Sequence, residues 1–412
     1  MAEAIALEQV DPQDVPLDQI DVSRAELMQH DMHWEYFRRL RAEDPVHFCA
    51  DSMFGPFWSI TKFNDIMEIE SNWKDFSSDF GIILADRPED FNTPNFIGMD
   101  PPKHDQQRKT VQGVVAPMNL AKLEGTIRER AARILDSLPV GETFDWVDTV
   151  SIELTTQMLA TIFDFPFADR RKLTYWSDMA TSGELAGGPT PEHERRAALM
   201  ECLETFTELR AQRKQEPEKP DLLSMLAHGK DTQNMPPMEF LGNLILLIVG
   251  GNDTTRNSIS GGVHFLNANP AEYDKLRNDL GLIPNMVSEI IRYQTPLAYM
   301  RRTVNRDLEF RGKQMKKGDK LAMWYVSGNR DEEAIERPDE FIIDRAKARH
   351  HLSFGFGVHR CMGNRLAEMQ LRVLWEEIMA RFRFVEQVGP VERVQSSFVR
   401  GYAEMPVQVH PW

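Results

Sequence analysis

The chain has 412 residues and carries 48 lysines and arginines against 64 aspartates and glutamates, a formal charge of −16. Such an acidic chain is a poor partner for polyanions, so no nucleic-acid partner is expected. The longest apolar run, residues 244–251, is too short to span a bilayer, and the N-terminus has no basic segment followed by an apolar run. We therefore expect a cytoplasmic protein with no transmembrane segment.

The first half of the chain is predicted to begin with a polar arm and to continue mainly as helices. Residues 1–30 form the acidic N-terminal arm, and residues 34–42 have the pattern of a short helix. Residues 46–63 alternate between apolar and polar side chains, which is typical of β-strands. From about residue 115 to 230, apolar side chains recur at helical spacing.

The second half contains the longest predicted helix, residues 237–268, whose centre is apolar on all sides. A shorter helix covers residues 286–293 and ends before a proline. Residues 303–326 alternate like strands, residues 363–382 form an amphipathic helix, and the last thirty residues resemble β-hairpins. This pattern predicts a mainly α protein with a minor β region.

No internal repeat, low-complexity tract or clean linker divides the chain. We therefore predict a single domain over residues 31–412, behind the arm.

The chain has three cysteines, Cys49, Cys202 and Cys361, which are scattered and odd in number. This argues against a disulfide framework. The sequence has no CxxC pair, which argues against a zinc ribbon or an iron–sulfur centre. Any cysteine that performs chemistry must therefore act alone.

The segment around Cys361 is the most informative in the chain. Glycines precede and follow this cysteine, and they permit backbone geometry and close cofactor approach that other residues prevent. A helix is predicted to begin directly afterwards, so its free amides and dipole favour a thiolate. The alternative is a buried cysteine beside a glycine-rich turn.

The spacing Phe354-x-x-Gly357-x-x-x-Cys361-x-Gly363 matches the haem-binding signature of the cytochrome P450 family. The resemblance implies that Cys361 is the metal ligand, bound to haem iron. A thiolate donates electron density to the iron and favours O–O cleavage. The resemblance also implies that Phe354, Gly355, His359 and Gly363 contact the cofactor.

The longest predicted helix contains the run Gly250, Gly251, Asn252, Asp253, Thr254 and Thr255. Each interior glycine costs about 1 kcal/mol in a helix, so two adjacent ones need a reason. The resemblance implies that Gly250 makes room over the haem. It also implies that Thr254 holds dioxygen or a water and that Asp253 delivers protons, the two catalytic roles. The alternative is a polar kink in a buried helix.

Glu289 and Arg292 form a Glu-x-x-Arg pair on one helical face, where they can form an ion pair. In the family this pair is structural and often has a third partner near Phe341. Here Glu340 stands where many members carry Arg or His, so the third partner stays open.

The segment from Asp100 to Arg108 resembles the start of the helix that binds a haem propionate. His104 and Arg108 are four residues apart and share one helical face. Arg302 and His359 occupy the matching positions for the remaining propionate contacts. Taken singly, each residue also fits a solvated surface charge.

The four segments occur in the order found in the family, and the resemblance covers roughly residues 30–412. It implies the cytochrome P450 fold, a triangular helical prism around a buried haem b. It also implies insertion of one oxygen atom from O2 into an unactivated C–H bond. No flavin or ferredoxin domain is attached, so electrons from NAD(P)H are expected through a separate reductase and an iron–sulfur ferredoxin.

Such ferredoxins are usually acidic, so a basic docking patch is predicted around the cysteine loop despite the net charge. The basic residues clustered in that part of the sequence are Arg345, Lys347, Arg349, Arg360 and Arg365.

Within the family, the run Gly250 to Asn257 and the segment Met99 to His104 most resemble the soluble bacterial alkane terminal hydroxylases. This implies a small hydrophobic substrate, a medium-chain alkane or fatty acid. The expected pocket residues, all apolar, are Ile82, Ile83, Leu84, Leu246, Val249, Leu297, Ala298, Met300, Phe398 and Val399.

Three alternatives stay open. One is a hydroxylase of a terpene or another compact hydrophobic molecule. Another is a peroxide-driven haem-thiolate enzyme, against which Asp253 and Thr254 argue. The third is a haem-binding sensor or carrier without turnover, which would need neither of these residues.

Overall fold

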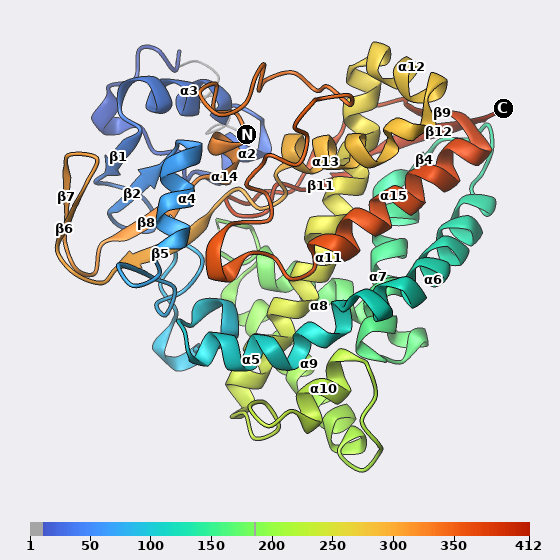
Figure 1. Ribbon diagram of the computed structural model, residues 1–412, viewed down its shortest axis with the longest axis horizontal. Coiled ribbons are helices and arrows are strands. Elements are labelled where there is room, and N and C mark those ends of the chain that lie inside the picture. The colour runs from blue at the N-terminus through green and yellow to red at the C-terminus, as the bar shows by residue number, and fades with distance from the viewer. Residues whose placement is uncertain (1–10, 185–186) are drawn as a thin grey trace.

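Helices fill most of the molecule and surround one long central helix, α11 (Figure 1). The computed structural model describes residues 11–184 and 187–412. The helices are α2 (Ala25–Gln29), α3 (His33–Glu43), α4 (Phe63–Ser71), α5 (Lys103–Gln112), α6 (Pro117–Asp136), α7 (Glu153–Phe163), α8 (Arg171–Thr181), α9 (Glu192–Arg213), α10 (Leu222–His228), α11 (Pro237–Ala268), α12 (Pro270–Asn278), α13 (Ile283–Gln294), α14 (Tyr325–Gly328) and α15 (Asn364–Arg381).

The main β-sheet lies at the edge of the helical body where the blue and orange segments meet, and a second sheet of β4, β12 and β9 lies near the C-terminus (Figure 1). The strands are β1 (Val46–Cys49), β2 (Phe57–Ile60), β3 (Phe76–Ser77), β4 (Phe144–Asp145), β5 (Met300–Val304), β6 (Leu308–Phe310), β7 (Lys313–Met315), β8 (Lys320–Met323), β9 (Phe382–Gln387), β10 (Glu392–Arg393), β11 (Tyr402–Glu404) and β12 (Pro406–Pro411). The main sheet has the order β1-β2-β8-β5-β3. Its β2 and β8 are parallel, with Trp58 opposite Leu321, so early and late segments of the chain share one sheet.

This architecture confirms the predicted mainly α fold with a minor β region. The longest predicted helix has the bounds of α11, and the strand pattern over residues 303–326 is confirmed as far as residue 323. Tyr325–Gly328 is helical instead, because Tyr325 and Val326 are both buried and their apolar character does not alternate. Helix α4 was not predicted, and its first residue falls in the segment assigned to strands.

The centre of α11 is less buried than an all-round apolar pattern suggests. Leu244 and Ile248 are buried in the core, but Leu246 and Val249 line an internal cavity. Elsewhere the helix packs against α7, α8, α13 and α15, which hold it in the middle of the molecule. None of the helices in residues 11–184 and 187–412 is both long and apolar enough to cross a membrane.

Part of the predicted acidic arm packs against the domain. Ile20, Val22 and Leu27 are fully buried and belong to a cluster that also contains Phe37 and Trp324. Residues 1–10 lie outside the described residues.

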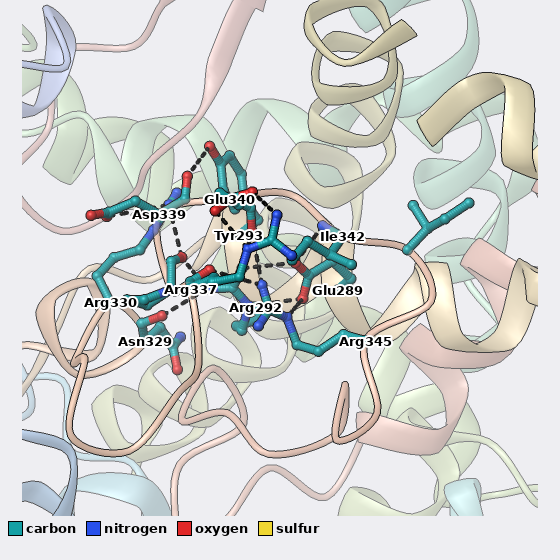
Figure 2. Close-up of polar contacts among 12 residues, drawn as sticks. Glu289, Arg292, Tyr293, Asn329, Arg330, Arg337, Asp339, Glu340, Ile342 and Arg345 are labelled. Carbon is teal, nitrogen blue, oxygen red and sulfur yellow. Dashed lines mark hydrogen bonds and ion pairs between the residues drawn. The ribbon is translucent and has the colours of Figure 1, made fainter. Parts of the chain in front are cut away.

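A buried ion-pair network fixes α13 beneath the segment that leads to Cys361. Figure 2 shows Arg292 and Arg345 converging on Glu289. Arg292 donates to both carboxylate oxygens of Glu289 at 2.8 Å, and Arg345 Nε donates to one of them at 3.1 Å. Burial raises the pKa of Glu289, but Arg292 and Arg345 and the hydrogen bonds hold it below its ordinary value. The carboxylate is therefore paired and ionised.

Arg345 is the third partner that the sequence left open. Its side chain is only 9% exposed, so it is not available on the surface. The prediction that Arg345 belongs to a docking patch is therefore wrong. Glu340 takes part through its backbone, since its carbonyl accepts hydrogen bonds from Arg292 and Arg345 while its side chain pairs with Arg337.

We expect Arg345→Ala to lower the free energy of unfolding by about 2–3 kcal/mol, because it removes a charged donor from a buried carboxylate. The matched control is Arg349→Ala, at a side chain that is 78% exposed, where a change within about 0.5 kcal/mol is expected. Chemical denaturation of both variants measures the difference. If both variants lost the same free energy of unfolding, the contact between Arg345 and Glu289 would not stabilise the fold.

Candidate active site

Cys361 lies on an irregular loop just before α15 and lines a cavity of about 380 Å³. Its sulfur accepts hydrogen bonds from the backbone amides of Gly363 and Asn364. Burial raises the pKa of the Cys361 thiol, whereas these amides and two arginines lower it. Cys49 and Cys202 are buried in the core, and burial raises the pKa of Cys49 to about 12. Of the three cysteines, Cys361 is the one placed to bind a group in the cavity.

Two glycines of the loop adopt the special backbone geometry that the sequence predicted, and Gly357 has a packing role that it did not reveal. Gly355 and Gly357 adopt φ values of +65° and +66°, which side-chain-bearing residues rarely adopt. A Cβ at Gly357 would lie 2.3 Å from the backbone oxygen of Glu70 in α4. Gly357 therefore lets the loop pack on α4, while Phe354, Gly355 and Gly363 line the cavity.

Four nitrogen-bearing side chains gather at one side of the cavity, as predicted. Arg108, Arg302 and His359 line the cavity, and the His104 ring lies 4.3 Å from that of His359, centre to centre. Burial lowers the pKa of His104, and burial together with Arg302 lowers the pKa of His359 to about 2. Within the described residues, His104 Nε2 and His359 Nδ1 are buried without a hydrogen-bond partner. This set fits carboxylate groups, which accept from both histidine and guanidinium nitrogens.

The rest of the cavity wall is mostly apolar and comes from several distant segments. The predicted pocket residues that line it are Ile82, Ile83, Leu246, Val249, Leu297, Met300 and Phe398. Leu84, Ala298 and Val399 are absent from the wall that the described residues form and lie in the core behind it. In extended backbone successive side chains point to opposite sides, so Leu297 faces the cavity and Ala298 faces away.

Sequence reasoning missed several wall residues. Phe91 and Phe96 lie in two short 3-10 helices, which have no periodic pattern long enough to predict, and Leu159 and Ile162 come from α7, for which no site role was expected. Arg87 also reaches the wall and forms no hydrogen bond or ion pair with any other residue that the structure describes. No local spacing marks these positions, because only the tertiary fold brings them to the cavity.

Helix α11 presents Gly250 and Thr254 to the cavity. No atom lies within 4 Å of the place where a Cβ on Gly250 would be, so this position leaves open space. The Thr254 hydroxyl donates to the Gly250 carbonyl oxygen at 2.9 Å. Its oxygen lone pairs therefore face the cavity with capacity to accept a hydrogen bond.

Asp253 points away from the cavity and is held by α8. One carboxylate oxygen accepts from Ser177 at 2.9 Å and the other from Thr181 at 3.2 Å. Arg256 lies 3.0 Å from Asp253 and also pairs with the half-exposed Asp178. Burial raises the pKa of Asp253, and Arg256 opposes the rise. Thr181 itself lines the cavity, so it connects the buried acid to the interior space.

Comparison with known proteins identifies the family. The Cytochrome P450 family model matches residues 189–405. Linalool 8-monooxygenase of Pseudomonas putida is 32% identical over 96% of this chain and 100% of that protein. The chain belongs to the cytochrome P450 family.

Two other cytochromes P450 extend the comparison. The methyl-branched lipid omega-hydroxylase of Mycobacterium tuberculosis (strain ATCC 25618 / H37Rv) is 29% identical over 96% of each chain. The solved structure of CYP153D17 from Sphingomonas sp. PAMC 26605 is 50% identical, covers 96% of this chain and 100% of its own, and superposes with a TM-score of 0.91.

Membership of the cytochrome P450 family implies a haem cofactor, and the cavity fits one. A thiol supported by two backbone amides faces the cavity, and unpartnered histidine nitrogens and two arginines lie where anionic groups can bind. The apolar remainder of the wall suits a hydrophobic substrate. The chain is a cytochrome P450 monooxygenase, and its cavity suits the hydroxylation of a hydrophobic substrate.

Proposed function

We propose that this cytochrome P450 hydroxylates the chain end of medium-chain alkanes or fatty acids. The observation that carries the proposal is one mostly apolar cavity whose wall contains both Cys361 and Thr254. The omega-hydroxylase among the relatives acts at a lipid chain end, which supports the same regiochemistry here. Arg87, a cation without an ion pair to any described residue, offers a partner for a fatty-acid carboxylate at the cavity wall.

When bound, haem b supplies O2 activation and oxygen insertion into a C–H bond. Cys361 is proposed to hold its iron, and Phe354, Gly355, Gly363 and Gly250 to border the ring. His104, Arg108, Arg302 and His359 are proposed to bind the propionates, because charge-assisted hydrogen bonds to carboxylates are strong and directional.

Two residues of α11 are proposed to manage protons. Thr254 accepts a hydrogen bond in the cavity and so positions a water or the oxygen substrate. Asp253 is proposed to deliver protons; burial raises the pKa of its carboxyl group, and Arg256 opposes the rise. The proton reaches the cavity past Thr181, which touches both Asp253 and the interior space. Arg256 and the half-exposed Asp178 connect the same acid to solvent.

We expect Asp253→Asn to slow substrate turnover at least about tenfold, because directed proton transfer contributes factors of this size or more.

Thr254→Ala should consume reducing equivalents at a normal rate but release more hydrogen peroxide per product. Product yield and peroxide per NAD(P)H consumed measure both effects. Asp274→Asn, a change at an exposed side chain of α12 outside this network, is the control and should alter turnover little. If Thr254→Ala released no more hydrogen peroxide per NAD(P)H consumed than the wild type, Thr254 would have no role in directing protons.

The choice of substrate is tested by product analysis with octane and octanoic acid. The proposal predicts 1-octanol from octane and the ω-hydroxy acid from octanoic acid. For octanoic acid the reason is that Arg87 is proposed to bind the carboxylate, which leaves the chain end to enter the apolar part of the cavity. Formation of internal alcohols alone would rule out chain-end hydroxylation. Linalool 8-monooxygenase is a relative, so linalool belongs in the same panel as the test of a terpene hydroxylase.

Electrons are proposed to come from NAD(P)H through a ferredoxin reductase and an acidic iron–sulfur ferredoxin. Lys347, Arg349, Arg360 and Arg365 are exposed and surround the loop in sequence, so they remain the proposed docking patch without Arg345. Arg360 also accepts a hydrogen bond from Arg108 through its carbonyl, which joins this surface to the cavity.

We expect Arg349→Glu combined with Arg365→Glu to slow reduction by ferredoxin and to weaken its dependence on salt, because exposed charges steer acidic partners. Stopped-flow reduction at low and high ionic strength measures the change. Arg133→Glu reverses a side chain that is 75% exposed on α6 and serves as the control. The proposed docking patch would be contradicted if the double variant and the control were reduced by ferredoxin at the same rates.

A further inference from the structure

Glu70, near the C-terminal end of α4, is a buried carboxyl group on the wall of the cavity. No motif in the sequence marks it. A buried carboxylate must be paired or hydrogen-bonded, or it must hold a proton. Its surroundings therefore decide its charge.

Three elements supply donors to Glu70. The backbone amide of Phe356, in the cysteine loop, donates to one carboxylate oxygen. The Tyr325 hydroxyl, from α14, donates to the other. Arg302 of β5 lies 3.5 Å from that second oxygen. Glu70 thus joins the cysteine loop to the arginine proposed to bind a propionate.

Arg302 is the positive charge in contact with Glu70 among the residues that the structure describes. Tyr325 is the titratable group of α14 that faces it, and His359 of the loop lies beyond Arg302. On α4 itself, Asp65 and Glu68 pair with Arg311 instead.

Other charged neighbours of α4 lie at its opposite end, where Asp331 accepts from the backbone amide of Phe63 and Lys62 pairs with Glu333. The guanidinium of Arg302 is therefore the positive charge that compensates a negative charge on Glu70 among the described residues.

We propose that Glu70 is a positioning residue that couples haem reduction to the uptake of a proton. This inference rests on the haem site proposed above. A propionate bound by Arg302 would place a second carboxylate on the same guanidinium, and like charges at one cation favour protonation of one of them. Glu70 is buried, so its charge is costly to keep without a full set of partners. Burial already raises its pKa, although Arg302 and its hydrogen bonds lower it in part.

The sign of the coupling follows from electrostatics. If haem is bound in the cavity, its reduction by one electron from the donor would remove one unit of positive charge near Glu70. A nearby carboxylate is then stabilised less, so Glu70 takes up a proton from solvent and becomes a neutral carboxylic acid. Conversely, a deprotonated Glu70 disfavours reduction. The reduction potential should therefore fall as pH rises through the pKa of Glu70.

The experiment is a potentiometric titration of the substrate-free, haem-loaded protein across the pH range in which it stays folded. The wild-type potential should fall with pH, below the limit of about 59 mV per pH unit, which is one proton per electron. Glu70→Gln preserves the shape of the side chain and should remove this fall. Glu68→Gln, the same change at an exposed side chain of the same helix, should behave as the wild type.

A fall that persists in Glu70→Gln would belong to a propionate or a histidine and would overturn the proposal. A wild-type potential independent of pH would overturn it as well. Both outcomes leave chain-end hydroxylation untouched, because no substrate is present in the measurement.

Tyr325→Phe provides a second test that does not depend on whether Glu70→Gln retains haem. It removes a donor that stabilises the carboxylate, so the pKa of Glu70 should rise. The pH at which the potential begins to fall should then move upward, while the fall itself remains. An unchanged curve in Tyr325→Phe would contradict the coupling.

Discussion

The structure depends on the contacts that fix the irregular loop carrying Cys361. Cys361 lies in neither helix nor strand, so the polar backbone groups of its loop must find partners elsewhere. Asn329 accepts from the backbone of Leu352, Glu70 accepts from Phe356, and Arg108 donates to the carbonyl of Arg360. These anchors come from three distant parts of the chain. The ion-pair network around Glu289 in turn fixes the helix that lies beneath the loop, so the thiol is positioned by buried polar contacts rather than by regular structure.

Features encoded by local spacing could be predicted from the sequence. The longest helix, the loop around Cys361 and the pair Glu289 and Arg292 each depend on residues within a few positions of one another, and hydrophobic periodicity or glycine placement reports them directly. The set of His104, Arg108, Arg302 and His359 was predicted from a resemblance, and the fold brings these residues together.

Features that depend on tertiary packing could not be predicted. Arg345 carries the same charge as the exposed arginines near it in sequence, and only its contact with Glu289 makes it structural. Leu84 and Ile83 are both apolar, but the direction of the backbone places one in the core and the other on the cavity wall. Glu70 looks like any helical glutamate until α14, β5 and the loop surround it. Burial and partners are properties of the fold, which no single stretch of sequence contains.

The order of strands in the main sheet constrains how the protein can assemble as it is synthesised. Strand β2 is flanked by β1, which leaves the ribosome just before it, and by β8, which ends at residue 323. The β1–β2 hairpin therefore waits with one edge unpaired while most of the helical body is made, and exposed strand edges promote association between chains. Contacts between such distant segments also slow folding. Nascent chains shorter than about residue 323 should consequently need protection from aggregation, even though their helices can already form.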